Sequence, residues 1–320
     1  TARQPYVLIR SLRALQDEIA SGSVTAHRAQ RPRMEEIREQ LRDLPVAVWD
    51  DVRNVRAVIY FVLSGGDPSI LKIVIGQQKS IPLVERRLLK GALAYGEGRM
   101  VDALSQLHKI DARSIDALLS GIVALIQATL IAKKDPLKAL SYFDEARLFA
   151  PGTLVEEAAL RQQILILARD GQLERFDLLS GQYTRRFPNS IFARNFRRQF
   201  FAGVARQSFK GAEVWFSRTE TELEKMPVSE RPSLYLAIAD EALKVGNLHI
   251  ARFAAEKARV LSAPGSRTLE RAKVFEGAAL AVSEEFAQGL ELLSGVDIAK
   301  ITVTDRQIRE SAMAVATNVG

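Results

Sequence analysis

The chain has 320 residues, of which 47% are hydrophobic and 26% charged, which is the composition of an ordinary folded protein. Its 45 lysines and arginines exceed its 38 acidic residues, and the formal net charge of +7 favours anionic partners such as nucleic acid, lipid headgroups or an acidic protein surface. Cysteine is absent, which excludes disulfide bonds, thiolate zinc sites, iron–sulfur clusters and a cysteine nucleophile.

The N-terminal part, residues 1–80, is predicted to form a helical segment. Apolar residues recur at spacings of three and four almost everywhere, and strict two-residue alternation is missing, so we predict an all-α fold. Asp67 and Asp135, each followed by Pro, are predicted N-caps. Four helices are expected in the N-terminal segment, at about 5–20, 31–43, 49–64 and 68–78.

A repeated helical hairpin is indicated further along the chain. The stretch ALSYFDEARLFAP (139–151) matches the second half of the tetratricopeptide pattern, a hairpin of ~34 residues with small residues where its helices cross and Pro after the second helix. Ala139, Phe143, Ala146 and Pro151 stand at the expected intervals. These residues are predicted to be structural, with Phe143 filling the groove against a neighbouring hairpin.

Residues 234–264 repeat this arrangement, with Pro264 one residue late. Weaker copies are residues 88–107, 165–188 and 274–293, and equivalent positions in the chain are 36 to 38 residues apart. We therefore predict an irregular tetratricopeptide-like helical-repeat array, or α-solenoid, over residues 81–296. A C-terminal helix or tail is expected at 297–320, without the clear cap that usually ends such arrays.

The apolar stretches of the chain are short. The longest, AVIYFVL (57–63) and IVALIQATLIA (122–132), fall short of the roughly 20 residues that cross a bilayer, so no membrane span is expected. The sequence begins at Thr1 rather than Met, which leaves open that a secretory signal preceded it.

No motif for catalysis, metal binding or cofactor binding is found. The histidines are far apart and lack ligand spacing, so we expect surface or packing roles for His27, His108 and His249. Adjacent carboxylates on a helix point in different directions, so they are expected to be solvated faces or first-turn charges rather than an acid–base pair. These pairs are Glu35/Glu36, Asp50/Asp51 and Glu156/Glu157. We expect no enzymatic activity and no cofactor.

Residues 178–212 are rich in arginine and phenylalanine and contain no acidic residue. Phe192, Phe196 and Phe200 recur every four residues, which predicts a helix with an apolar stripe. Two interpretations are open. In the first, the phenylalanines enter the core and the arginines face water or pair with acids elsewhere. In the second, the arginines form an exposed basic patch for an acidic partner. The candidate partner-binding residues are Arg194, Arg197, Arg198 and Arg206. Phenylalanines at core spacing are not available to stack on bases, so no nucleic acid partner is expected.

The stretch LPVAVWDDVRNVRAVIYFVLSGGDP (44–68), followed by ERRLLKGALAYGEGRMVDALSQL (85–107), resembles the MotC family of periplasmic motility proteins found with bacterial flagellar motors. The similarity runs through the whole chain. The resemblance implies a helical fold, export to the periplasm by a signal peptide, no enzymatic activity, and binding to the periplasmic part of the stator protein MotB in support of motor rotation. A cytosolic helical-repeat adaptor and the superhelical part of a cell-wall lytic enzyme are the alternatives. A lytic enzyme would need a catalytic glutamate in a separate compact domain, for which this chain has no room.

Overall fold

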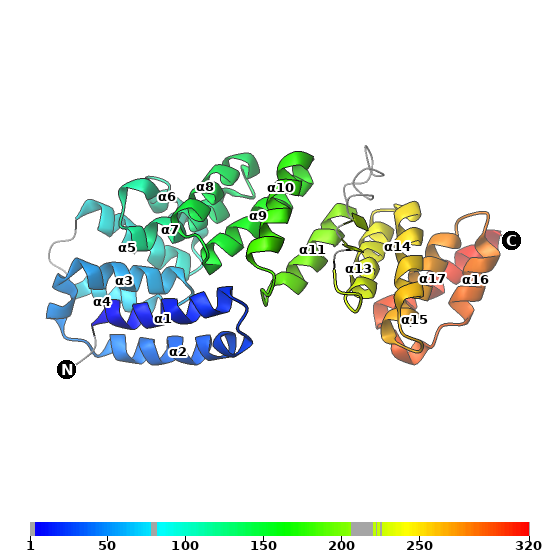
Figure 1. Cartoon of the computed structure of the whole chain (residues 1–320), viewed down its shortest axis with the longest axis horizontal. Helices are drawn as coiled ribbons and strands as arrows, with labels where there is room; N and C mark the ends of the chain where they lie inside the picture. Colours follow the sequence, from blue (N-terminus) through cyan, green and yellow to red (C-terminus); the bar gives the residue numbers. More distant parts are fainter. Residues whose placement is uncertain (1–3, 78–81, 206–219, 222, 225, 320) are drawn as a thin grey trace. The chain divides into compact units, whose positions relative to one another are not determined.

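The computed structural model describes residues 4–77, 82–205, 220–221, 223–224 and 226–319 (Figure 1). Within these residues the chain is helical and has no strand, which confirms the predicted all-α class. None of the helices in this part of the chain is both long and apolar enough to cross a membrane. Two compact units are present, Thr1–Ala193 and Arg194–Gly320.

The first part of the first unit is built around one central helix, α3. Nine of the twelve residues of α3 are buried, and the helix contacts α1, α5 and α7. Trp49 and Phe61 are fully buried in the same hydrophobic core. The elements in this part are α1 (Pro5–Ala20), α2 (Val24–Arg42), the 3-10 helix η1 (Val46–Asp50), α3 (Val52–Leu63) and α4 (Ser69–Gln77).

Helix α2 begins earlier than the sequence predicts. A start near residue 31 was expected because of Pro32, but α2 extends from Val24 to Arg42 and contains this proline. The hydroxyl of Ser23 accepts a hydrogen bond from the Ala26 N–H at 3.1 Å and caps the helix there. An interior proline removes one backbone hydrogen bond, but the helix continues, with Ile37 buried in the core.

The remaining helices of the first unit pack mainly on their neighbours in sequence, as α5 does on α6, α7 on α8, α8 on α9, and α9 on α10. Asp135 caps α8 as predicted, by accepting from the Lys138 N–H at 3.0 Å. Helix α4 begins at Ser69, one residue later than predicted, so Asp67 lies two residues before it and accepts from the Ser69 N–H at 2.8 Å. The helices are α5 (Leu83–Gly96), α6 (Met100–Leu107), η2 (Ala112–Ser114), α7 (Ala117–Ile131), α8 (Pro136–Phe149), α9 (Leu154–Asp170) and α10 (Leu173–Arg186).

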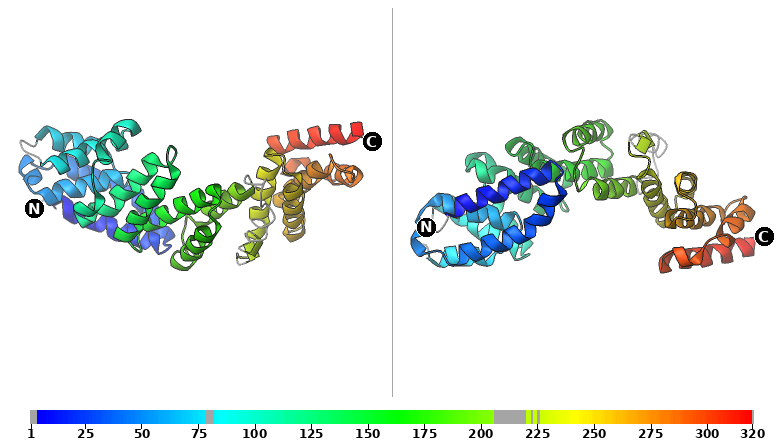
Figure 2. Two further views of the ribbon diagram at one scale, coloured as in Figure 1. Left: turned by 90° about the horizontal axis from the view of Figure 1, so that it is seen from above. Right: turned by 60° about the horizontal axis from the view of Figure 1, so that its bottom comes forward.

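The second unit is also helical, and α15 contacts α13, α14, α16 and α17 (Figure 2). Helices α15 and α16 approach closely, because a Cβ atom on Gly277 would lie 2.7 Å from Leu293 Cγ and 3.0 Å from the Gly289 carbonyl oxygen. The elements are α11 (Ala193–Ala205), which enters this unit at Arg194, α13 (Arg231–Lys244), α14 (Leu248–Leu261), α15 (Arg267–Leu280), α16 (Phe286–Ser294), η3 (Ile298–Lys300) and α17 (Val303–Val319).

The division into 1–80, 81–296 and 297–320 is based on where the sequence repeat is found. The two compact units are instead defined by contacts between residues, so their boundary falls elsewhere. Those segments, and the arrangement of the helices as a repeat array, stay predictions.

Truncation of Phe143 is expected to destabilise the protein. Its side chain is fully buried in α8, so Phe143→Ala should lower the free energy of unfolding by about 3–5 kcal/mol, through lost burial and the cavity left behind. Leu148→Ala on the same helix removes a side chain that is 70% exposed, so it should change the free energy of unfolding by less than about 0.5 kcal/mol. Urea titrations of both variants measure the difference, and equal midpoints would contradict the assignment.

A methyl group at Gly91 is expected to separate α5 from α6. A Cβ atom there would lie 2.5 Å from Cδ2 of the buried Leu107. The overpacking in Gly91→Ala should cost about 1–3 kcal/mol, more than the gain of up to about 1 kcal/mol from better helix propensity. Gly76 of α4 has open space around it, so Gly76→Ala should be neutral or stabilising. Thermal melts measure the change in melting temperature, which should fall for Gly91→Ala and stay equal or rise for Gly76→Ala. A fall for both variants would contradict overpacking at Gly91 as the cause.

Candidate functional site

The arginines predicted to form one basic patch lie in different environments. Arg194 and Arg198 are exposed on α11, whereas Arg197 Nη2 lies 2.7 Å from Glu230 Oε2 and both side chains are 19% exposed. Arg206 lies outside the described residues. Since Arg197 is neutralised by an acid from outside the helix, the exposed charge of α11 comes from Arg194 and Arg198.

The phenylalanines of this segment contribute to the core, as one of the two sequence interpretations predicts. Phe196 and Phe200 are buried, with ring centroids 6.0 Å apart, and Phe200 stacks edge-on against Phe201 at 4.9 Å. Phe192, just before α11, is partly buried, and the Arg161 guanidinium lies 4.9 Å from its ring centroid. The burial of Phe196 and Phe200 fixes which face of α11 points outward.

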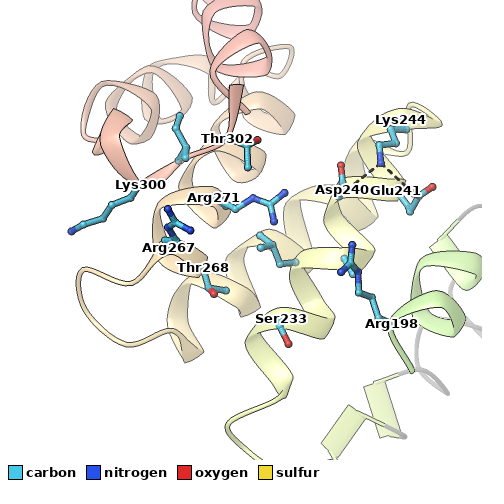
Figure 3. A pocket seen from close by; sticks show the side chains of 13 residues that line it. Arg198, Ser233, Asp240, Glu241, Lys244, Arg267, Thr268, Arg271, Lys300 and Thr302 are labelled. Atoms are coloured by element: carbon cyan, nitrogen blue, oxygen red, sulfur yellow. Dashed lines mark hydrogen bonds and ion pairs between the residues drawn. The ribbon is translucent and has the colours of Figure 1, made fainter. Parts of the chain in front are cut away.

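Arg198 lines a polar pocket in the second unit (Figure 3). The cavity has a volume of about 520 Å³, within the range of about 300–1,000 Å³ that is usual for ligand pockets. Side chains from α11, α13 and α15 and from residues 300–302 form its walls. The lining includes the cations Arg198, Lys244, Arg267, Arg271 and Lys300, the carboxylates Asp240 and Glu241, and the hydroxyls of Ser233, Thr268 and Thr302.

Lys244 is paired with both lining carboxylates. Its Nζ lies 3.1 Å from Asp240 Oδ2 and 3.2 Å from Glu241 Oε1 (Figure 3). Burial by itself lowers the pKa of Lys244, but the hydrogen bonds to Asp240 and Glu241 outweigh it, so the pKa is raised overall. The ammonium group therefore stays charged and balances part of the negative charge on this wall.

Arg271 is held by a buried carboxylate at the start of α17. Its Nε lies 2.8 Å and its Nη2 3.2 Å from the two carboxylate oxygens of Asp305, which is 2% exposed. The Thr302 N–H also donates to Asp305, at 3.0 Å. Burial by itself raises the pKa of Asp305, but the hydrogen bonds from Arg271 and Thr302 outweigh it and lower the pKa overall. This pair ties α15 to α17 beside the pocket.

Among the residues that the structure describes, two cations of the pocket have no acidic partner. Within the described residues, the exposed side chains of Arg198 and Arg267 form no hydrogen bond or ion pair, whereas Lys300 pairs with Asp297 at 3.2 Å. Arg198 and Arg267 therefore give the pocket an excess of positive charge.

Sequence reasoning identified Arg198 and missed the rest of the pocket. Arg267 and Arg271 do carry a local signal, because residues four apart share one face of a helix. No local sequence pattern indicates that this face of α15 lines the same pocket as Arg198, because α11 and α15 are far apart in the sequence. Only the packing of α15 in the second unit brings these charges to one cavity.

The expectation for Glu156 and Glu157 is correct in one part and wrong in the other. Both are first-turn charges of α9, as expected, but they are not solvated, with 3% and 0% of their surfaces exposed. Glu156 Oε2 accepts from Arg186 Nη2 at 2.7 Å, and Glu157 accepts from the hydroxyl of Tyr183 at 3.1 Å and from that of Ser190. Hydrogen bonds from residues outside α9 compensate the cost of burying these two carboxylates. The geometry of a single helix does not reveal such partners.

None of the three histidines is among the residues that line this pocket. The His27 ring stands edge-on to Phe192 with centroids 5.8 Å apart, His108 Nδ1 lies 2.7 Å from the Leu104 carbonyl oxygen, and His249 is exposed on α14. Among the described residues, no three His, Asp or Glu side chains are arranged to hold a metal ion.

Comparison with known proteins identifies the family. The family model described as Chemotaxis protein MotC matches residues 1–320. The chain belongs to the MotC family. Chemotaxis protein MotC of Rhizobium meliloti (strain 1021) is 31% identical over 316 residues, which cover 98% of this chain and 72% of that relative. No solved structure matches the chain. The family resemblance seen in the sequence is confirmed, and membership of the MotC family connects the chain with motility.

Loss of the Asp305 carboxylate is expected to destabilise the second unit in a pH-dependent way. Because the folded-state pKa lies below the unfolded value of 3.8, Asp305 stabilises the fold above that pH, and this contribution is lost as the pH falls through the folded pKa. Asp305→Asn should therefore cost about 1–3 kcal/mol at neutral pH, with a smaller cost below pH 3.8.

Urea titrations at neutral and acidic pH measure this difference. Glu310→Gln is the matched control, because Glu310 is exposed on the same helix. A cost for Asp305→Asn that does not change with pH would contradict the role of the ionised carboxylate.

Proposed function

We propose that this protein is a non-enzymatic motility protein of the periplasm, which binds the periplasmic part of the flagellar stator protein MotB and supports motor rotation. Membership of the MotC family over residues 1–320 carries the proposal. The relative from Rhizobium meliloti, named as a chemotaxis protein, supports it. In this proposal the protein works by holding and positioning a partner.

We also propose that the helices between residues 81 and 296 form an irregular tetratricopeptide-like array, preceded by the helical segment 1–80 and followed by 297–320. Consecutive packed helices support this arrangement, as do buried small residues such as Ala103, Ala139 and Ala251. Such arrays present long surfaces to protein partners, because each repeat contacts only its neighbours. A surface of this kind suits a positioning role.

The proposed partner-binding residues are those of α11 and the segment that follows it, Arg194, Arg197, Arg198 and Arg206. Exposed cations steer an acidic partner surface during encounter and raise the association rate more than the final affinity. Arg194 and Arg198 suit this role best, because Arg197 is paired with Glu230.

A pull-down with the isolated periplasmic domain of MotB tests the proposed function. We expect the immobilised chain to retain that domain, with weaker retention as salt is added, because salt screens exposed charges. No retention at low salt would refute the proposal. Arg194→Glu, Arg197→Glu and Arg198→Glu together should weaken binding; unchanged retention would exclude a role for α11 and leave the positioning role intact.

Two further assays separate the alternatives. Cell fractionation distinguishes a periplasmic protein from a cytosolic helical-repeat adaptor. A turbidity assay on purified cell walls distinguishes a motility protein from part of a lytic enzyme. We expect the protein in the periplasmic fraction and no fall in turbidity.

A further inference from the structure

We propose that the pocket between α11, α13 and α15 binds an acidic peptide segment of a protein partner, with Arg198 and Arg267 each pairing with one of its carboxylates. This inference rests on the proposed function only for the identity of the protein that carries the segment. The binding chemistry follows from the pocket itself.

The first argument is the uneven charge of the pocket. Lys244 is balanced by Asp240 and Glu241, and Arg271 is balanced by Asp305. Arg198 and Arg267 lack such a partner within the described residues (Figure 3). A guanidinium has a planar fork of N–H donors that matches a carboxylate, so each of these two arginines is suited to one carboxylate of a ligand.

The second argument is the position of the two arginines. Arg198 extends from α11 at one side of the pocket and Arg267 from the first turn of α15 at the other, with α13 between them (Figure 3). Two separated guanidinium groups suit an extended ligand that carries more than one carboxylate. A peptide with acidic side chains at intervals meets this requirement.

The third argument is the mixture of polar groups, which favours a peptide over a polyphosphate chain. Asp240 and Glu241 are hydrogen-bond acceptors in the wall, and a polyphosphate chain has no N–H group to donate to them. The same carboxylates are able to accept hydrogen bonds from peptide N–H groups, and the hydroxyl of Ser233 is able to donate to a peptide carbonyl. Leu236 and Ile301 add apolar surface beneath the ligand.

Fluorescence anisotropy with a labelled peptide in which Glu alternates with Gly tests the site. We expect the whole chain to bind this peptide at low salt, and to bind a peptide with Gln in place of Glu at least about 10-fold more weakly. Arg198→Gln and Arg267→Gln should each weaken binding of the Glu peptide by about 10-fold. Arg267→Lys should restore part of the affinity, because it keeps the charge and loses the planar fork.

Arg306→Gln is the matched control, since Arg306 is an exposed arginine of the same unit, on α17, and does not line the pocket. We expect it to leave peptide binding within about twofold of the unchanged protein. An equal loss in Arg306→Gln would show diffuse attraction and overturn the proposed pocket. Unchanged binding in the Arg198→Gln, Arg267→Gln double variant, with an unchanged thermal melt, would also overturn it.

Competition experiments distinguish the ligand class. Displacement of the Glu peptide by inorganic phosphate or a short oligonucleotide at a lower concentration than by unlabelled peptide would overturn the acidic-peptide proposal in favour of a phosphate site. The pull-down with the MotB domain remains a separate readout. Failure of that domain to bind refutes the proposed function alone. Peptide binding that is unchanged when Arg198 and Arg267 are substituted refutes this inference alone.

Discussion

Neighbouring helices in both units pack closely because small residues stand where they cross. In the first unit the backbone of α5 comes close to Leu107 of α6 at Gly91. In the second unit Gly277 and Gly289 bring the backbones of α15 and α16 together. Helix axes approach to about 8 Å only where little side-chain volume intervenes. The positions of all side chains on the outward helix faces, including those of the pocket, depend on this packing.

Buried and half-buried ion pairs then determine which charges remain available to a partner. Arg197 is paired with Glu230, Arg259 with Glu276 and Arg271 with Asp305, in each case between residues distant in the sequence. Removal of one member of such a pair leaves the other uncompensated, which is why these pairs constrain the fold. Within the described residues, the cations of the pocket that have no acidic partner are Arg198 and Arg267.

A motility function and a cationic peptide pocket are compatible with each other. A positioning protein needs an exposed surface with some selectivity, and charged groups in a cavity provide selectivity because they reject ligands that leave them unpaired. The exposed Arg194 on α11 would add to the long-range attraction of an acidic partner. Arg198 and Arg267 would pair with the carboxylates of the bound segment. In the proposed mechanism, the helices supply rigidity and these few side chains supply recognition.

The sequence by itself determined the helical class, the cap at Asp135, the burial of Phe196 and Phe200, and the family. Periodicity, capping and composition are local properties, and local properties are sufficient for such predictions. Tertiary structure alone decided the burial of Glu156 and Glu157, because their partners lie outside α9. It also decided that Arg197 is paired while Arg198 is exposed, and that Arg198 and Arg267 line the same pocket. Those outcomes depend on which faces of distant helices come together, and this is a property of packing that no single segment encodes.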